Sequence, residues 1–213
     1  MFKQYREIEN GEYFLISADC SQGGLDYNAC QFISKTKLDI PLVYHSRGVA
    51  AQMTSAIHPV IERIFDRTSL KPIVCFERNN GGGSEMERLD AMNRLSKYEL
   101  FTMPIIGQSS LENETKKFGW DTNTTTRPIL IGDWLVAFNS KALIIYDDET
   151  IKEHKTFIIN QNGKPEASRG KNDDLVISCA IGWQLFNRCS QGQLGKMEDY
   201  HFPEDEHLKR RFY

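Results

Sequence analysis

Short apolar runs alternate with turn-rich polar stretches in the first 50 residues, which is the pattern of strands joined by tight connections. Three such runs occupy residues 13–19, 28–35 and 42–47, with SQGGLD and LDIP between them. Strands separated by turns this short pair antiparallel, because a parallel connection needs about a dozen residues or more. The pattern therefore predicts an antiparallel meander of three strands.

The spacing of apolar residues then lengthens to three and four positions. It predicts an amphipathic helix from Val49 to about Arg67, with a local kink at Pro59. A compact β-branched strand, IVCFE, follows at residues 73–77. Beyond it, EMERLDAMNRLSKY (85–98) has the composition of a helix.

The run LFTMP at residues 100–104 completes the predicted order β-β-β-α-β-α-β. Antiparallel strands followed by α/β units favour a mixed sheet. We therefore expect an α/β fold in which three antiparallel strands are followed by parallel strands, with helices on both faces.

The second half of the chain begins with a long polar connection at residues 106–128, a kind of segment that is usually functional or mobile. An Asn-Gly pair farther on is a strong hairpin signal. The elements expected after the connection are a helix to about Asn139, an apolar run at 142–146, a short helix at 147–155, a hairpin at 156–168 and a helix from Asp173 to about Arg188. We expect one domain over residues 1–190 and a polar C-terminal tail over 191–213.

Composition limits the classes of function. With 40% hydrophobic and 11% aromatic residues in 213, the chain can bury a core, and its net charge of −3 gives no support for nucleic-acid binding by itself. A polyanion would need a local basic patch or bound metal. The five cysteines are scattered without ligand spacing and indicate reduced thiols. Because no signal peptide or membrane span is apparent, we expect a soluble intracellular protein.

Acidic residues occupy the ends of predicted elements. Asp19 ends the first strand, Glu77 ends the fourth, and the adjacent Asp173 and Asp174 open the last helix. A sheet brings strand ends together, and a helix across it can deliver its first turn to the same place. Clustered carboxylates repel each other, and a hard cation is the usual way to hold them close. The pattern predicts a site for two Mg²⁺ or Mn²⁺ ions, which together can hydrolyse a phosphodiester.

Each acid also has a structural interpretation. Asp173 or Asp174 can cap the helix, and Asp19 can be a turn residue before SQGG. Glu77 is harder to explain in this way, because Glu is uncommon after a buried β-branched strand. Asp26 is interpreted either as a turn residue after Gly-Gly or as an additional metal ligand.

Four segments, in order, read ISADCSQGGLDYNA, VCFERNNGG, KFGWDTNTTTRPILI and TFIINQNGKPEASRGKNDDLVISCAIGW, and they extend over most of residues 13–186. Together they resemble the C-terminal nuclease domain of the tailed-phage terminase large subunit, which has an RNase H-like fold. The resemblance implies metal-dependent endonuclease cleavage of concatemeric viral DNA during genome packaging, with little sequence specificity.

The catalytic acids of that family fall on Asp19, Glu77, Asp173 and Asp174, and family members often have His where this chain has Asn172. The resemblance implies double-stranded DNA, a packaging ATPase domain, a small terminase subunit and a portal as partners, in the cytoplasm of a host. This chain contains no G-x-x-x-x-G-K-[ST] phosphate loop. The chain is therefore expected to be either an excised nuclease domain or a stand-alone nuclease, and we favour the excised domain, because Met1 leads almost directly into the first strand.

Basic residues near these segments are candidate phosphate contacts that carry little sequence information. They are Arg78, Arg127, Lys164, Arg169 and Lys171. Arg127 is interpreted equally as a brace for its own helix, and Lys116 and Lys117 as a solvated loop.

Two other functions remain open on the sequence alone. A resolvase- or transposase-type nuclease of the same fold would share the carboxylates but cut particular DNA structures. A non-catalytic docking domain of a packaging motor would keep the fold without cleavage, and the presence of all four acids argues against it.

Overall fold

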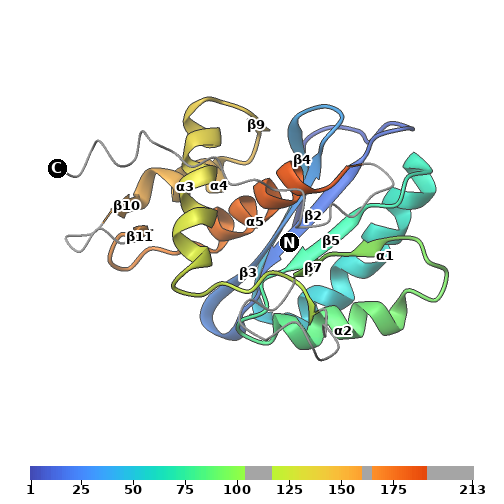
Figure 1. The fold of residues 1–213 in the computed structure, drawn as a ribbon, viewed down its shortest axis with the longest axis horizontal. Helices are drawn as coiled ribbons and strands as arrows, with labels where there is room; N and C mark the ends of the chain where they lie inside the picture. Colours follow the sequence, from blue (N-terminus) through green and yellow to red (C-terminus); the bar gives the residue numbers. More distant parts are fainter. Residues whose placement is uncertain (104–116, 160–164, 191–213) are drawn as a thin grey trace, which may run out of the picture.

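A single mixed sheet organises the protein, and the computed structural model describes residues 1–103, 117–159 and 165–190 (Figure 1). The sheet has seven strands in the order β1-β4-β3-β2-β5-β6, with β9 paired to β4. The strands are β1 (Phe2–Gln4), β2 (Phe14–Asp19), β3 (Gln22–Ser34), β4 (Asp39–Val49), β5 (Ile73–Phe76), β6 (Glu99–Leu100) and β9 (Ile144–Ile145).

The direction of the strands agrees with the prediction. β2, β3 and β4 pair antiparallel, whereas β5 runs parallel to β2 and β6 runs parallel to β5. The parallel register sets Ala18 opposite Phe76, so Asp19 and Glu77 follow at the same edge of the sheet. The predicted order of antiparallel and then parallel strands is confirmed.

Helices cover both faces of the sheet, as predicted (Figure 1). α1 (Ala50–Thr68) and α2 (Gly82–Met92) pack on one face, where α1 buries a stripe that includes Met53, Ile57 and Ile61. α3 (Thr126–Asn139) and α5 (Asp174–Arg188) pack on the other face. α4 (Asp148–Thr156) lies against α5.

Two small sheets complete the fold: β7 (Thr102–Met103) with β8 (Lys117–Phe118), and β10 (Phe157–Ile159) with β11 (Pro165–Ala167). The second pair confirms the predicted hairpin. Its Asn-Gly turn and the predicted tail over 191–213 lie outside the described residues.

Four local predictions are wrong. The run at 100–104 is not one strand, because its residues are divided between β6 in the main sheet and β7 in a small sheet. The helix expected at 85–98 begins at Gly82 and ends at Met92, because the glycine run forms its first turn. The expected turn at 21–26 belongs largely to β3, which continues with an irregular register. β1 and β9 were not expected, because each is too short to show a period and depends on β4 for its hydrogen bonds.

The five cysteines all lie within the described residues, where they are buried and form no disulfide. In the same parts of the chain, no helix combines the length and the apolar character that a bilayer crossing requires.

α5 approaches the sheet very closely at Gly182. A Cβ atom there would lie 2.2 Å from Ile33 Cδ1 and 2.6 Å from Ser17 Oγ. Nearby, Ser17 Oγ donates a 2.7 Å hydrogen bond to the backbone oxygen of Ser178, so the backbone of the helix packs directly on side chains of the sheet.

Gly182→Ala is expected to lower the free energy of unfolding by about 1–3 kcal/mol, because the added methyl would overlap the side chains of Ile33 and Ser17, which are buried in a packed core and would have to shift. The matched control is Gly132→Ala on α3, where a Cβ would meet nothing within 4 Å. That change should be neutral or stabilise by up to about 1 kcal/mol, since Ala favours helix over Gly. Urea unfolding of both variants measures this, and a Gly182→Ala protein as stable as wild type would contradict it.

Candidate active site

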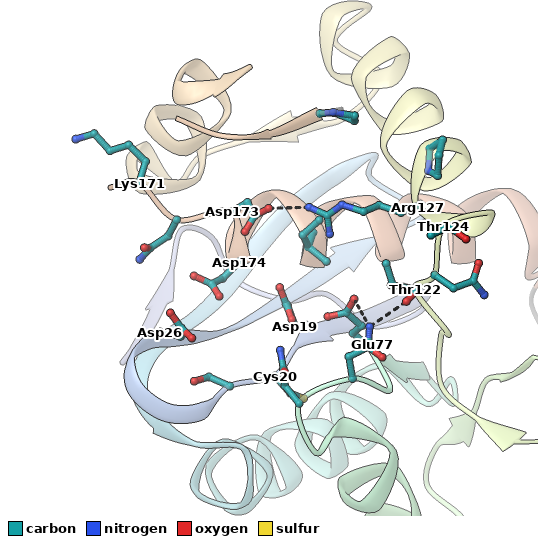
Figure 2. Close-up of a pocket in the computed structure, with 18 residues that line it drawn as sticks. Asp19, Cys20, Asp26, Glu77, Thr122, Thr124, Arg127, Lys171, Asp173 and Asp174 are labelled. Atoms are coloured by element: carbon teal, nitrogen blue, oxygen red, sulfur yellow. Dashed lines mark hydrogen bonds and ion pairs between the residues drawn. The ribbon is translucent and has the colours of Figure 1, made fainter. Parts of the chain in front are cut away.

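An open cleft of about 1010 Å³ lies at the edge of the sheet where β2 and β5 end (Figure 2). All four predicted acids line it, although they come from three separate parts of the chain. The lining residues are Asp19, Cys20, Ser21, Asp26, Glu77, Asn79, Asn80, Thr122, Asn123, Thr124, Arg127, Pro128, Pro165, Lys171, Asn172, Asp173, Asp174 and Ile177.

Asp19 and Glu77 form the floor of the cleft, with 7% and 5% of their surfaces exposed. The backbone N–H of Glu77 donates to Ala18 O at 2.8 Å, which joins the two strand ends. Burial raises the pKa of Asp19 well above its usual value, and the neighbouring Glu77, Asp174 and Asp173 raise it further. Asp19 therefore ends a buried strand beside other acids and does not open a turn.

Close contact with α2 fixes the backbone at Glu77. A Cβ on Gly82 would lie 1.8 Å from Glu77 O, so only glycine allows the helix to start here. Asn79 Nδ2 donates to Glu77 Oε1 at 3.3 Å and to Thr122 O at 3.0 Å. The glycine-rich loop and the segment at Thr122 together orient this carboxylate.

Asp173 and Asp174 enter the cleft from the first turn of α5 (Figure 2). Asp173 occupies the N-cap position, but its side chain makes no capping hydrogen bond. Instead, its Oδ2 accepts a 2.9 Å hydrogen bond from Arg127 Nη2. Asp174 accepts from the backbone of Tyr27, and burial, reinforced by Asp173, raises its pKa to about 7. The interpretation of Asp173 as a simple side-chain cap is therefore wrong.

The side chains in the cleft suit hard divalent cations, which prefer oxygen ligands. Burial and then repulsion from neighbouring acids raise the pKa of Asp19 and of Asp174, and a bound cation would stabilise the charged form of both carboxylates. Within the described residues, no group of three or more His, Cys, Asp or Glu side chains is yet close enough to enclose a metal ion. Metal binding by these acids stays a prediction that rests on their chemistry and shared location.

The predicted phosphate contacts divide into two groups. Arg127 and Lys171 line the cleft. Arg78 and Arg169 do not: Arg78 Nη1 donates to Phe118 O at 2.9 Å and braces β8, and Arg169 is exposed on the approach to α5. Lys164 and Lys116 lie outside the described residues. Lys117 is exposed on β8.

Several polar residues of the cleft were not singled out from the sequence. Thr122 and Thr124 lie on the side of the cleft opposite Asp26 (Figure 2), and Asn79 also lines the cleft; all three belong to loops that the sequence marked only as polar connections. The available signal was their position directly after a strand-end acid or before an expected helix. Asp26 also lines the cleft, and it belongs to β3 rather than to a separate turn.

No protein-family model and no curated protein matches the chain. Among solved structures, it is similar to the large terminase nuclease of the thermophilic phage G20c with bound cobalt, at 18% identity and a TM-score of 0.57, over 85% of this chain and 84% of that one. The large terminase nuclease domain of Thermus phage P74-26 matches at 15% identity and a TM-score of 0.57, over 90% and 87%.

A third similar structure is the Mn-soaked human cytomegalovirus terminase nuclease domain, at 12% identity and a TM-score of 0.53, over 82% of this chain and 83% of that one. Sequence identity this low supports a statement about architecture and no finer one. The protein has the RNase H-like fold of the terminase nuclease domains.

Proposed function

We propose that this protein is a metal-dependent DNA endonuclease that cleaves concatemeric viral DNA during genome packaging. The observation that carries the proposal is the convergence of Asp19, Glu77 and the Asp173–Asp174 pair in one cleft. The solved terminase nuclease domains of similar fold, in crystals that contain cobalt or manganese, support it.

The four carboxylates would hold two Mg²⁺ or Mn²⁺ ions. When bound, such a pair supplies an activated water and stabilises the leaving oxygen of a phosphodiester. Asp19 lies on the floor beside Glu77, opposite the start of α5, and would contribute to both ions (Figure 2). Asp174 points toward Asp19 and Asp26, whereas Asp173 points toward Arg127 (Figure 2).

Arg127 and Lys171 would contact DNA phosphates at the rim of the cleft. Arg127 already binds Asp173 through Nη2, while its Nε has no hydrogen-bond partner within the described residues. That Nε is buried and cannot reach DNA, but 26% of the Arg127 side chain is exposed, so the guanidinium can orient an acidic ligand and still offer another N–H to a phosphate. Since such contacts read no bases, cleavage with little sequence preference follows.

A terminase-type role would involve partner proteins. It implies a packaging ATPase domain, a small terminase subunit and a portal. The polar and acidic cleft would admit double-stranded DNA only with metal bound, because the net charge of the chain is −3.

Asp19→Asn is expected to lower cleavage of supercoiled plasmid in Mn²⁺ by at least about 100-fold, beyond the 10- to 100-fold typical of residues that only support a metal ligand. The matched control is Asp66→Asn on α1, an exposed aspartate paired with Lys97, which should cleave like wild type. EDTA should abolish the activity of both the wild type and the control.

The same assay separates the other functions. Undiminished cleavage by Asp19→Asn would falsify the metal-site assignment, and no cleavage by wild type would favour a docking domain. Linear duplex, plasmid and four-way junctions are compared side by side. A strong preference for junctions would favour a resolvase-type nuclease.

Lys171→Gln is expected to weaken duplex binding a few-fold and to lower the magnitude of the slope of log K against log salt by about 0.9, the value for one phosphate contact. Fluorescence anisotropy over a salt series, with Ca²⁺ in the buffer, measures both. Lys152→Gln serves as the control, because Lys152 is exposed on α4 outside the cleft lining. Equal slopes for Lys171→Gln and wild type would remove Lys171 from the interface.

A further inference from the structure

The N-terminus of α5 is capped by a residue from a different helix. An N-cap side chain normally accepts hydrogen bonds from the backbone N–H groups two and three positions later, which here belong to Leu175 and Val176. Both groups instead donate to Glu153 Oε1, at 2.7 and 3.1 Å. Glu153 therefore takes the place that Asp173 would ordinarily fill.

We propose that Glu153 is a positioning residue, which caps α5 from α4 and thereby allows the carboxylate of Asp173 to turn into the cleft, beside that of Asp174, where it can contribute to metal binding. The inference rests on the proposed function. Glu153 is not among the lining residues of the cleft, and it acts through the first turn of α5.

The two roles open to Asp173 exclude each other. A carboxylate folded back onto the N–H groups of Leu175 and Val176 would leave the cleft, because those groups point along the axis of α5. In the structure the carboxylate is turned toward Arg127, and its Oδ2 lies 2.9 Å from Arg127 Nη2 (Figure 2). This orientation is possible because the N–H groups of Leu175 and Val176 already donate to Glu153.

Glu153 belongs to α4, a helix that other parts of the protein hold near both of its ends. Asp147 caps α4, accepting from Thr150 N at 2.7 Å, and it also forms an ion pair with Lys3 at 3.1 Å. The adjacent His154 is buried, and its Nε2 accepts a 2.6 Å hydrogen bond from Trp134 Nε1. Its Nδ1 therefore carries the proton and donates to Thr150 O at 2.6 Å. α4 is tied at both of its ends, so Glu153 has a fixed position.

The oxygen of Glu153, rather than its charge, is what the cap requires. Burial raises the pKa of Glu153 to about 7, and both protonation states retain an acceptor oxygen for the two N–H groups. A glutamine at this position retains the acceptor and removes the charge. The Gln and Ala variants therefore distinguish a capping role from a purely electrostatic one.

The test compares Mn²⁺ binding, by calorimetry, in wild type and variants. Glu153→Ala is expected to bind Mn²⁺ at least tenfold more weakly, whereas Glu153→Gln stays within about threefold of wild type. Glu149→Gln is the matched control on the same helix, since Glu149 pairs with Lys3 and His45 and not with α5. It should bind as wild type does.

A double-mutant cycle isolates the link to Asp173. Asp173→Ala should weaken Mn²⁺ binding in the wild-type background but have little further effect when Glu153→Ala is present, because Asp173 has then left the cleft to cap the helix. A merely structural role of Glu153 predicts additive effects. Backbone amide NMR shifts of Leu175 and Val176 report the cap directly, in the absence of metal.

Three results would overturn the inference alone: wild-type Mn²⁺ affinity in folded Glu153→Ala, an equal loss in Glu153→Gln, or additivity in the cycle. A wild-type protein that neither bound Mn²⁺ nor cleaved DNA would overturn the proposed function, and with it this inference. If Glu153→Ala failed to fold, Glu153→Gln and the amide shifts of Leu175 and Val176 in wild type would still decide whether the cap exists.

Discussion

At Gly182, the backbone of α5 lies so close to Ile33 of β3 and Ser17 of β2 that an added methyl group would require their side chains to shift. This contact, with the hydrogen bond from Ser17 to Ser178, sets the height of the helix above the sheet. The first turn of the helix therefore meets the edge where the parallel pair β2 and β5 ends. Without that approach, the Asp173–Asp174 pair would stand away from Asp19, and the cleft would lose one wall. Packing thus determines the geometry of the carboxylates.

Bringing these carboxylates together costs stability, because each buried charge loses water and faces others of the same sign. The raised pKa of Asp19 and of Asp174 records that cost. The surrounding structure compensates through contacts that do not depend on metal. Among them are the backbone hydrogen bond from Glu77 to Ala18 and the ion pair of Asp173 with Arg127. A site that is destabilised locally and supported by its scaffold is typical of catalytic centres.

Much of the scaffold could be predicted because its signals are local. The strand ends at Asp19 and Glu77, the hairpin and the apolar body of α5 each follow from a short stretch of sequence. The remaining features depend on contacts between distant segments. β1 is a strand only because β4 supplies its hydrogen bonds, and Glu153 looks like one more charge on a polar helix until its bonds to a segment 22 residues away are known. The periodicity of a helix or strand cannot reveal such contacts.

A shared fold alone does not establish an activity, since the same architecture supports different chemistries. Cleavage is instead supported by the cleft, where two strand ends and the start of one helix supply carboxylates to one place. The adjacent acids at the start of α5 supply two of these carboxylates. If one of them were needed as a cap, the pair would offer a single ligand. Because Leu175 N and Val176 N donate to Glu153, the helix end does not require the carboxylate of Asp173, and both acids line the cleft.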